Sequence, residues 1–239
     1  MRFAGGMSIK TLKLGQSKNG QSIEVLSRSG DPRDCRILVL SGLHGDETEG
    51  VILNTLILNE IFYNHTHLLP KLAFLPIANP DGFSLSQRWN ANNVDLNRNW
   101  PTKDWTAEYS NPRYPPGPAA ESEVETKYLR QFIEGSKIDF VLDLHSYLDT
   151  VLLPLFHKAG ETQEHKKIHE SLLELSTGVG LRIDHDPEGL GYKITGGFHT
   201  WCFENEIHTL TVEIEKGLGQ HAIKGKFVDP LIRFLANLI

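Results

Sequence analysis

Short apolar runs that alternate with helix-forming segments constrain this chain more than any other feature. The runs occupy 36–41 (RILVLS), 72–77 (LAFLPI) and 140–144 (FVLDL), and the main helix-forming segments are 48–63, 122–136 and 162–177. Runs of this length and composition are typical of strands that are buried on both faces of a sheet. Their alternation with helices predicts an α/β fold, with a mixed, mostly parallel central sheet and helices on both faces.

Length and composition favour one domain and exclude several classes of protein. The 239 residues contain no internal repeat, so we expect a single domain over 1–239. The net charge of −6, without a basic run, argues against nucleic acid as a partner. No segment approaches the ~18 apolar residues of a membrane span, and 1–14 lacks the pattern of a signal peptide. We therefore expect a cytoplasmic protein without a membrane partner; the sequence carries no indication of its oligomeric state.

Other segments complete the expected architecture. Residues 209–215 alternate, so that Thr211, Glu213 and Glu215 face away from the apolar side of a strand. Asp229-Pro230 is predicted to cap a final helix. Residues 101–118 hold five of the twelve prolines and read as a long surface loop, and 185–197 read as a glycine-rich loop. The two cysteines fit neither a disulfide framework nor a thiolate metal site, so Cys35 and Cys202 are predicted to be reduced core thiols.

The segments after the first and third apolar runs carry metal-ligand chemistry. His44-Gly45-Asp46-Glu47 follows the first run, and His145 follows the third. Both imidazoles are expected just past the carboxyl ends of strands, where open α/β sheets place their sites. Two His and one Glu leave the fourth position of a tetrahedral zinc free for water, so we predict one Zn²⁺ held by His44, Glu47 and His145. The same spacing at His185 and Glu188 lies inside a loop and is interpreted as a solvated cluster.

Polar residues between these segments suggest an anion pocket. Arg88, Asn97 and Arg98 offer the donors that grip a carboxylate, although arginine and asparagine are also common in solvated loops. Asp95 either accepts the second N–H of a metal-bound imidazole or forms a turn. Asp143 receives no role.

A carboxylate on the 209–215 segment is the candidate general base. Glu213 and Glu215 share one face of the predicted strand, and spacing alone does not choose between them. The chain has neither a G-x-S-x-G nucleophile elbow nor a glycine-rich phosphate loop, which disfavours serine hydrolases and nucleotide-binding proteins.

These residues occur in the order found in the zinc carboxypeptidases of the carboxypeptidase A type, and the chain resembles that family over roughly 36–215. The most specific segments are NPDG (79–82) and RWNANNVDLNRNW (88–100). Within the family, GYKITGGFHTWC (191–202) is most similar to the bacterial murein peptide amidases, which cut the bond between γ-D-glutamate and meso-diaminopimelate.

The resemblance implies a role for each residue. His44, Glu47 and His145 would hold zinc, with Asp95 orienting His44. Asn97 and Arg98 would bind the terminal carboxylate of a small peptide substrate, and Arg88 would stabilise the oxyanion. Tyr192 would lie on a loop that closes over the substrate, and Glu213, rather than Glu215, would be the base. His199 falls where the family lines its specificity pocket; the alternative is an ordinary histidine in the first turn of a helix.

The expected function is zinc-dependent hydrolysis of an amide bond next to a free carboxylate. N-acyl amino acid deacylases of the aspartoacylase and succinylglutamate desuccinylase type share the same plan of zinc residues and are the first alternative. The Asn79-Pro80-Asp81-Gly82 turn and Tyr192 with Gly196-Gly197 favour the peptidase branch. A non-catalytic binder would be expected to lack a ligand or the base, and none is missing.

Overall fold

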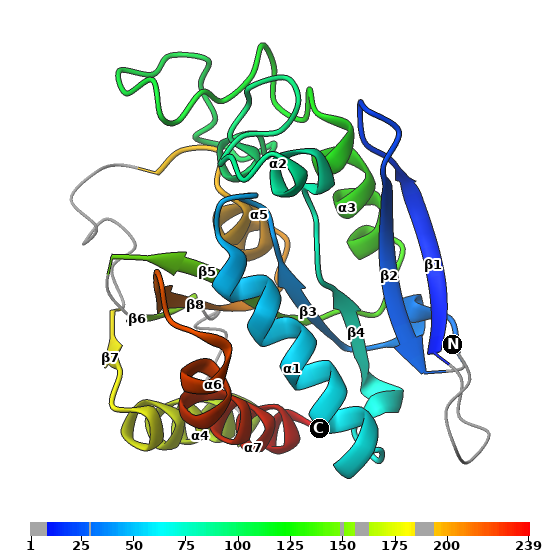
Figure 1. Cartoon of the computed structure of the whole chain (residues 1–239), viewed down its shortest axis with the longest axis vertical. Helices are drawn as coiled ribbons and strands as arrows, with labels where there is room; N and C mark the ends of the chain where they lie inside the picture. Colours follow the sequence, from blue (N-terminus) through cyan, green and yellow to red (C-terminus); the bar gives the residue numbers. More distant parts are fainter. Residues whose placement is uncertain (1–8, 29, 149–150, 156–162, 185–193) are drawn as a thin grey trace.

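The central element of the computed structural model is one twisted sheet (Figure 1). The structure describes residues 9–28, 30–148, 151–155, 163–184 and 194–239. Its eight described strands run in the order β1-β2-β4-β3-β5-β8-β6-β7. Their bounds are β1 Ile9–Gln16, β2 Ser22–Arg28, β3 Ile37–Ser41, β4 Leu72–Leu75, β5 Phe140–Tyr147, β6 Val151–Leu155, β7 Arg182–Ile183 and β8 His208–Glu215.

The four strands at the centre of the sheet are mutually parallel. β4, β3, β5 and β8 pair in parallel, while β2 joins β4 and β6 joins β8 in antiparallel fashion. This bears out the mixed, mostly parallel central sheet. Parallel pairing places the carboxyl ends of β3, β5 and β8 at the same edge of the sheet, which brings the segments after distant runs together.

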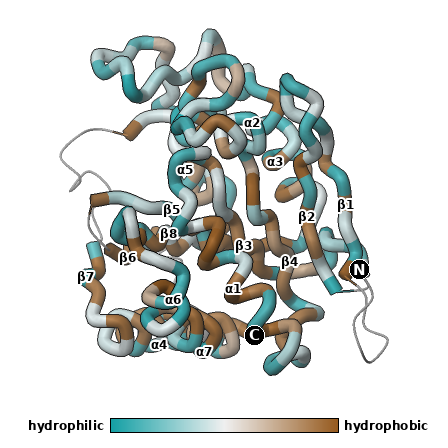
Figure 2. Tube along the Cα trace, in the orientation of Figure 1, coloured by the Kyte–Doolittle hydropathy of each residue, from teal (hydrophilic) through white to brown (hydrophobic). Residues whose placement is uncertain are grey.

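Helices cover both faces of the sheet. Their bounds are α1 Thr48–Asn64, α2 Pro80–Ser84, α3 Val124–Glu134, α4 Gln163–Val179, α5 Phe198–Glu204, α6 Gln220–Ile223 and α7 Asp229–Leu238. One apolar core packs α1, α4 and α7 against one face, and a second packs α3 and α5 against the other. Figure 2 shows hydrophobic residues gathered along β3 and β4. Burial of these apolar faces is the main stabilising contribution.

Most of the expected elements are present, and two expectations were wrong in detail. β5 extends to Tyr147, so His145 lies inside the strand rather than past its end. Asp229 does not cap α7, because Val228 before it is already helical and belongs to a π-helical turn, Lys224–Val228, that runs into α7. Residues 101–118 contain neither helix nor strand, as expected of a loop.

Four strands, β1, β2, β6 and β7, had no counterpart in the sequence prediction. β1 and β2 form a hairpin at the sheet edge, where one face meets solvent and apolar patterning is weak. β6 contains Pro154, which usually argues against a strand. It is tolerated because, among the described residues, β7 pairs with Val151 and Leu152 and leaves the other edge of Pro154 unpaired. Cys35 and Cys202 are buried free thiols, as predicted, and burial raises the pKa of Cys35 to about 11.

Candidate functional site

The turn between β3 and α1 presents the first two candidate ligands. Gly42 has a φ of +68°, a region that residues with a Cβ rarely adopt. A Cβ on Gly45 would collide with the backbone of Gly82, so glycine lets this turn pack against α2. Glu47 occupies the N-cap position of α1 but its side chain caps nothing. Its carboxylate turns instead towards the imidazoles of the site.

Three buried side chains form the candidate metal centre. Glu47 Oε1 lies 2.8 Å from His44 Nδ1, and Glu47 Oε2 lies 2.8 Å from His145 Nδ1. One possible ligand atom from each of these residues lies within 4.8 Å of the others. Two imidazole nitrogens and a carboxylate are a donor set that suits Zn²⁺, so the residues present fit this metal.

An aspartate binds the second nitrogen of each imidazole. Asp95 Oδ1 lies 3.0 Å from His44 Nε2, and Asp143 Oδ2 lies 2.9 Å from His145 Nε2. All four side chains are at most 3% exposed. Such carboxylates fix the tautomer of a ligand imidazole and raise its basicity, so both Nδ1 atoms are left to face the centre. Asp143 had no role in the sequence reasoning; its spacing to His145 could have revealed it, since residues two apart on a strand share a face.

The charges of the centre favour a bound cation. Burial alone would raise the pKa of Glu47, but the charges and hydrogen bonds of His44 and His145 hold that pKa well below its usual range. Burial alone would lower the pKa of His145, but Asp143 and Glu47 raise that pKa well above its usual range. The centre therefore keeps its carboxylate ionised and stabilises positive charge between the two ring nitrogens.

Arg88 is tied directly to the metal centre. Its Nε donates to Asp95 Oδ2 over 2.9 Å, and its Nη1 lies 3.3 Å from Glu47 Oε1 and 3.2 Å from His44 Nδ1. The same Asp95 also accepts the backbone N–H of Asn97 at the start of a 3₁₀ turn, Leu96–Arg98. Asp95 therefore forms a turn and orients His44 at once, so the two readings of this residue were not alternatives.

Asn97 and Arg98 line the same pocket as His44, Glu47 and Arg88. Asn97 Oδ1 accepts the backbone N–H of Phe198 over 2.8 Å, which fixes the amide plane against the start of α5. Arg98 is 4% exposed, and its Nη1 donates to the carbonyl oxygen of Asn97. The structure thus brings the three predicted anion-binding residues together beside the metal centre.

Glu213 and His199 line the same pocket. Glu213 is the register partner of His145 on the neighbouring strand, and burial raises its pKa to about 7. Glu215 is exposed, which distinguishes the two carboxylates that spacing left equivalent. His199 lies in the first turn of α5 and also lines the pocket, so its place in the helix does not decide between the two readings. Burial and the nearby charge of Arg98 lower its pKa to about 4.

Several pocket residues were not anticipated. Arg113 and Tyr114 come from the proline-rich loop, and Leu153, Leu155 and Thr211 come from β6 and β8. The predicted residues Tyr192, His185 and Glu188 lie outside the described residues.

Glu49 joins the ends of the two strands that carry His145 and Glu213. Its buried carboxylate accepts from Ser146 Oγ over 2.8 Å, just after His145, and from the backbone N–H of Gly217 over 2.7 Å, just beyond β8. Glu49 lies in the first turn of α1, two residues after Glu47. Its hydrogen bonds therefore fix the ends of β5 and β8 relative to the start of the helix, where Glu47 lies.

Comparison with known proteins agrees with this geometry. Residues 7–221 match the model of the zinc carboxypeptidase family. The chain is similar to murein peptide amidase A of Escherichia coli (strain K12), with 30% identity over 192 residues covering 74% of this chain and 69% of the relative. It is also similar to murein peptide amidase A of Vibrio campbellii, with 31% identity covering 84% and 78%.

A solved structure shares the fold. The murein-tripeptide amidase of Escherichia coli O157 superposes with a TM-score of 0.70 at 23% identity, over 94% of this chain and 91% of that one. Among the described residues, no helix is long and apolar enough to cross a membrane. The sequence match and the His44–Glu47–His145 centre together establish zinc as the cofactor and hydrolysis as the chemistry. The chain belongs to the zinc carboxypeptidase family and is a zinc-dependent metallocarboxypeptidase.

Proposed function

We propose that this chain, as a single catalytic domain, removes the C-terminal residue from small murein peptides by cutting the γ-D-glutamate–meso-diaminopimelate bond. The observation that carries the proposal is one pocket in which Arg98 and Asn97 lie beside His44 and Glu47. A carboxylate-binding pair next to a metal centre selects an amide bond adjacent to a free carboxylate. Murein peptides as the substrate class are suggested by the two murein peptide amidases to which the chain is similar, and the bond is the one that the family resemblance implies.

Asn97 and Arg98 bind the terminal carboxylate of the substrate. The guanidinium offers two parallel N–H donors, and the amide of Asn97 is held by its bond to Phe198 with Oδ1 already used. Binding at this point fixes the C-terminal residue, so that its amide bond lies over the metal centre. Because the substrate is already oriented when it is bound, the entropic part of the activation barrier is lower.

Arg88 stabilises the charge that develops on the carbonyl oxygen. Arg88 is 9% exposed and its guanidinium is held by Asp95, so it needs no reorganisation as the oxyanion forms. His44, Glu47 and His145 would hold the zinc ion, which when bound would supply a Lewis acid for this carbonyl and lower the pKa of a water molecule.

Glu213 is the general base. A carboxyl with a pKa of about 7 is matched to taking a proton from the attacking water and passing it to the leaving amine near neutral pH. His199, with Leu153 and Leu155, contacts the side chain of the C-terminal residue. The family resemblance assigns Tyr192 to substrate binding. A role in recycling murein peptides in the cytoplasm would fit such a substrate.

Mass spectrometry of L-Ala-γ-D-Glu-meso-diaminopimelate incubated with the protein tests the substrate. We expect free diaminopimelate with zinc-loaded protein and none after chelation. An intact tripeptide with zinc bound would rule out this substrate. N-acetylaspartate and N-succinylglutamate in the same assay test the deacylase alternative, which the match to the peptidase family disfavours.

Paired variants on β8 test the base. Glu213→Gln should lower kcat by about 10²–10⁴-fold while zinc stays bound, since general-base catalysis contributes about that much. Glu215→Gln removes a carboxylate from the exposed end of the same strand and should leave kcat unchanged. Full activity of Glu213→Gln would refute the assignment.

A further inference from the structure

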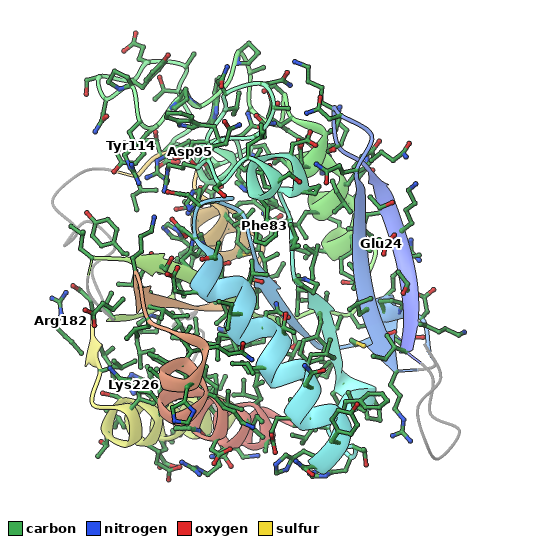
Figure 3. The ribbon with its side chains drawn as sticks, in the orientation of Figure 1. Glu24, Phe83, Asp95, Tyr114, Arg182 and Lys226 are labelled. Atoms are coloured by element: carbon green, nitrogen blue, oxygen red, sulfur yellow. The ribbon has the colours of Figure 1, made fainter. Side chains whose placement is uncertain are left out.

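Tyr114 contacts two of the three arginines that line the pocket. The guanidinium carbon of Arg88 lies 5.1 Å from the centroid of its ring, and that of Arg98 lies 5.0 Å from the same centroid. Both distances are within the range of cation–π attraction. Figure 3 shows Tyr114 and Asp95 near each other in the loops at one end of the molecule.

The backbone around Tyr114 is fixed on both sides. The carbonyl oxygen of Arg113 accepts the indole N–H of Trp89 over 2.8 Å, next to Arg88 in sequence. The carbonyl oxygen of Pro115 accepts the N–H of Asp95 over 2.9 Å. Pro115 and the buried Pro116 further restrict the chain. The proline-rich loop is therefore attached to the segment that carries Arg88 and Asp95.

The ring of Tyr114 lies where it can reduce the repulsion between the charges of Arg88 and Arg98. Arg88 and Arg98 are 9% and 4% exposed, so their like charges are poorly screened by water. An aromatic face carries partial negative charge and attracts both cations without consuming their N–H donors. The ring therefore adds to the hydrogen bonds by which Asp95 and the carbonyl of Asn97 already hold the two guanidinium groups.

We propose that Tyr114 is a positioning residue that holds Arg88 and Arg98 at a fixed separation and so sets how far the substrate carboxylate lies from the scissile carbonyl. The inference rests on the proposed roles of the two arginines. It makes the ring a determinant of substrate class: the pocket accepts a carboxylate on the carbon next to the amide nitrogen and rejects one displaced by an extra methylene.

Kinetics of zinc-loaded variants test the proposal. Tyr114→Leu should lower kcat/KM for the tripeptide about ten- to hundredfold, or about 1.4–2.8 kcal/mol, and should raise KM as well as lower kcat. It should also reduce the preference over an analogue whose last residue is a β-homo amino acid. Tyr114→Phe keeps the ring and should stay within about twofold of the wild type.

A matched control and an isosteric series separate positioning from folding. Tyr109 lies on the same loop and is 56% exposed, so Tyr109→Leu should leave both constants unchanged. Trifluorophenylalanine at 114 keeps the shape of phenylalanine but withdraws electrons from the ring face. Its kcat/KM should therefore lie between those of Tyr114→Phe and Tyr114→Leu. Equal activity of the trifluorophenylalanine variant and Tyr114→Phe, or equal loss in Tyr114→Phe and Tyr114→Leu, would overturn the proposal.

A readout independent of turnover distinguishes this inference from the proposed function. NMR of the arginine Nε–Hε groups in the zinc-loaded protein should show ring-current-shifted signals for Arg88 and Arg98. Those signals should move or broaden in Tyr114→Leu and persist in Tyr109→Leu. Unchanged signals in Tyr114→Leu would refute positioning, whether or not the tripeptide is cleaved. Lack of turnover with the expected NMR changes would contradict only the substrate assignment.

Discussion

Asp143 should control zinc affinity through His145. Asp143→Asn replaces a buried carboxylate that lies 2.9 Å from His145 Nε2 with a neutral amide of the same size. The imidazole loses the charged acceptor that makes its other nitrogen a better ligand. Loss of such a partner costs about 10–100-fold in metal affinity, which corresponds to about 1.4–2.8 kcal/mol.

A second effect of the same substitution has the opposite sign. Without the Asp143 charge the raised pKa of His145 in the metal-free protein falls, so protons compete less with zinc. Proton competition disappears at high pH, whereas the loss of ligand basicity does not. The deficit in zinc affinity should therefore be small near pH 6 and reach its full size at higher pH.

Competition with a chromogenic chelator at several pH values measures this affinity. Asp139→Asn is the control, because Asp139 precedes the same strand and pairs with Arg36 at the surface, away from the centre. We expect this control to bind zinc as tightly as the wild type. Equal affinity of Asp143→Asn and wild type at high pH would show that the contact does not tune the metal.

Three further predictions concern stability. Glu49→Ala removes the buried carboxylate that accepts hydrogen bonds from Ser146 and Gly217, and should lower the free energy of unfolding by about 2–4 kcal/mol in urea titrations. As a control, Asn59→Ala at an exposed position of α1 should change this free energy by less than about 0.5 kcal/mol. Burial raises the pKa of Glu125 in the folded state, so stability should fall as pH rises from the unfolded pKa through the folded one. Glu125→Gln should abolish that fall and be more stable than the wild type above this window, and an unchanged pH profile would contradict the reasoning. Chelation should lower the melting temperature, because zinc at 1,000 times its Kd stabilises the folded state by about 4 kcal/mol; equal melting with and without chelator would argue against a tight site.

Local sequence identified the fold class and brought the candidate metal ligands to attention. Buried strands and helices follow from hydrophobic patterning over a few residues, so 36–41 and 140–144 were recognisable as strands. The spacing of His44 and Glu47 lies within one turn, and the Asn97-Arg98 pair is contiguous. Information of this kind survives in a single sequence because it depends on near neighbours in the chain.

Tertiary structure decided the remaining parts of the site. Glu213 and Glu215 share a strand face, and only the position of the strand end puts Glu213 in the pocket and Glu215 in solvent. Glu49 bonds to Ser146, 97 residues away in the chain. Tyr114 contacts Arg98 from a loop without periodic pattern. No local signal in the sequence marks either partner. The β6 strand forms because β8 offers it an edge, despite Pro154. The sequence by itself determined which chemistry the chain can perform, because ligand types and spacings are local. Which carboxylate, which ring and which loop serve that chemistry depends on contacts between distant segments, and those exist only once the sheet has assembled.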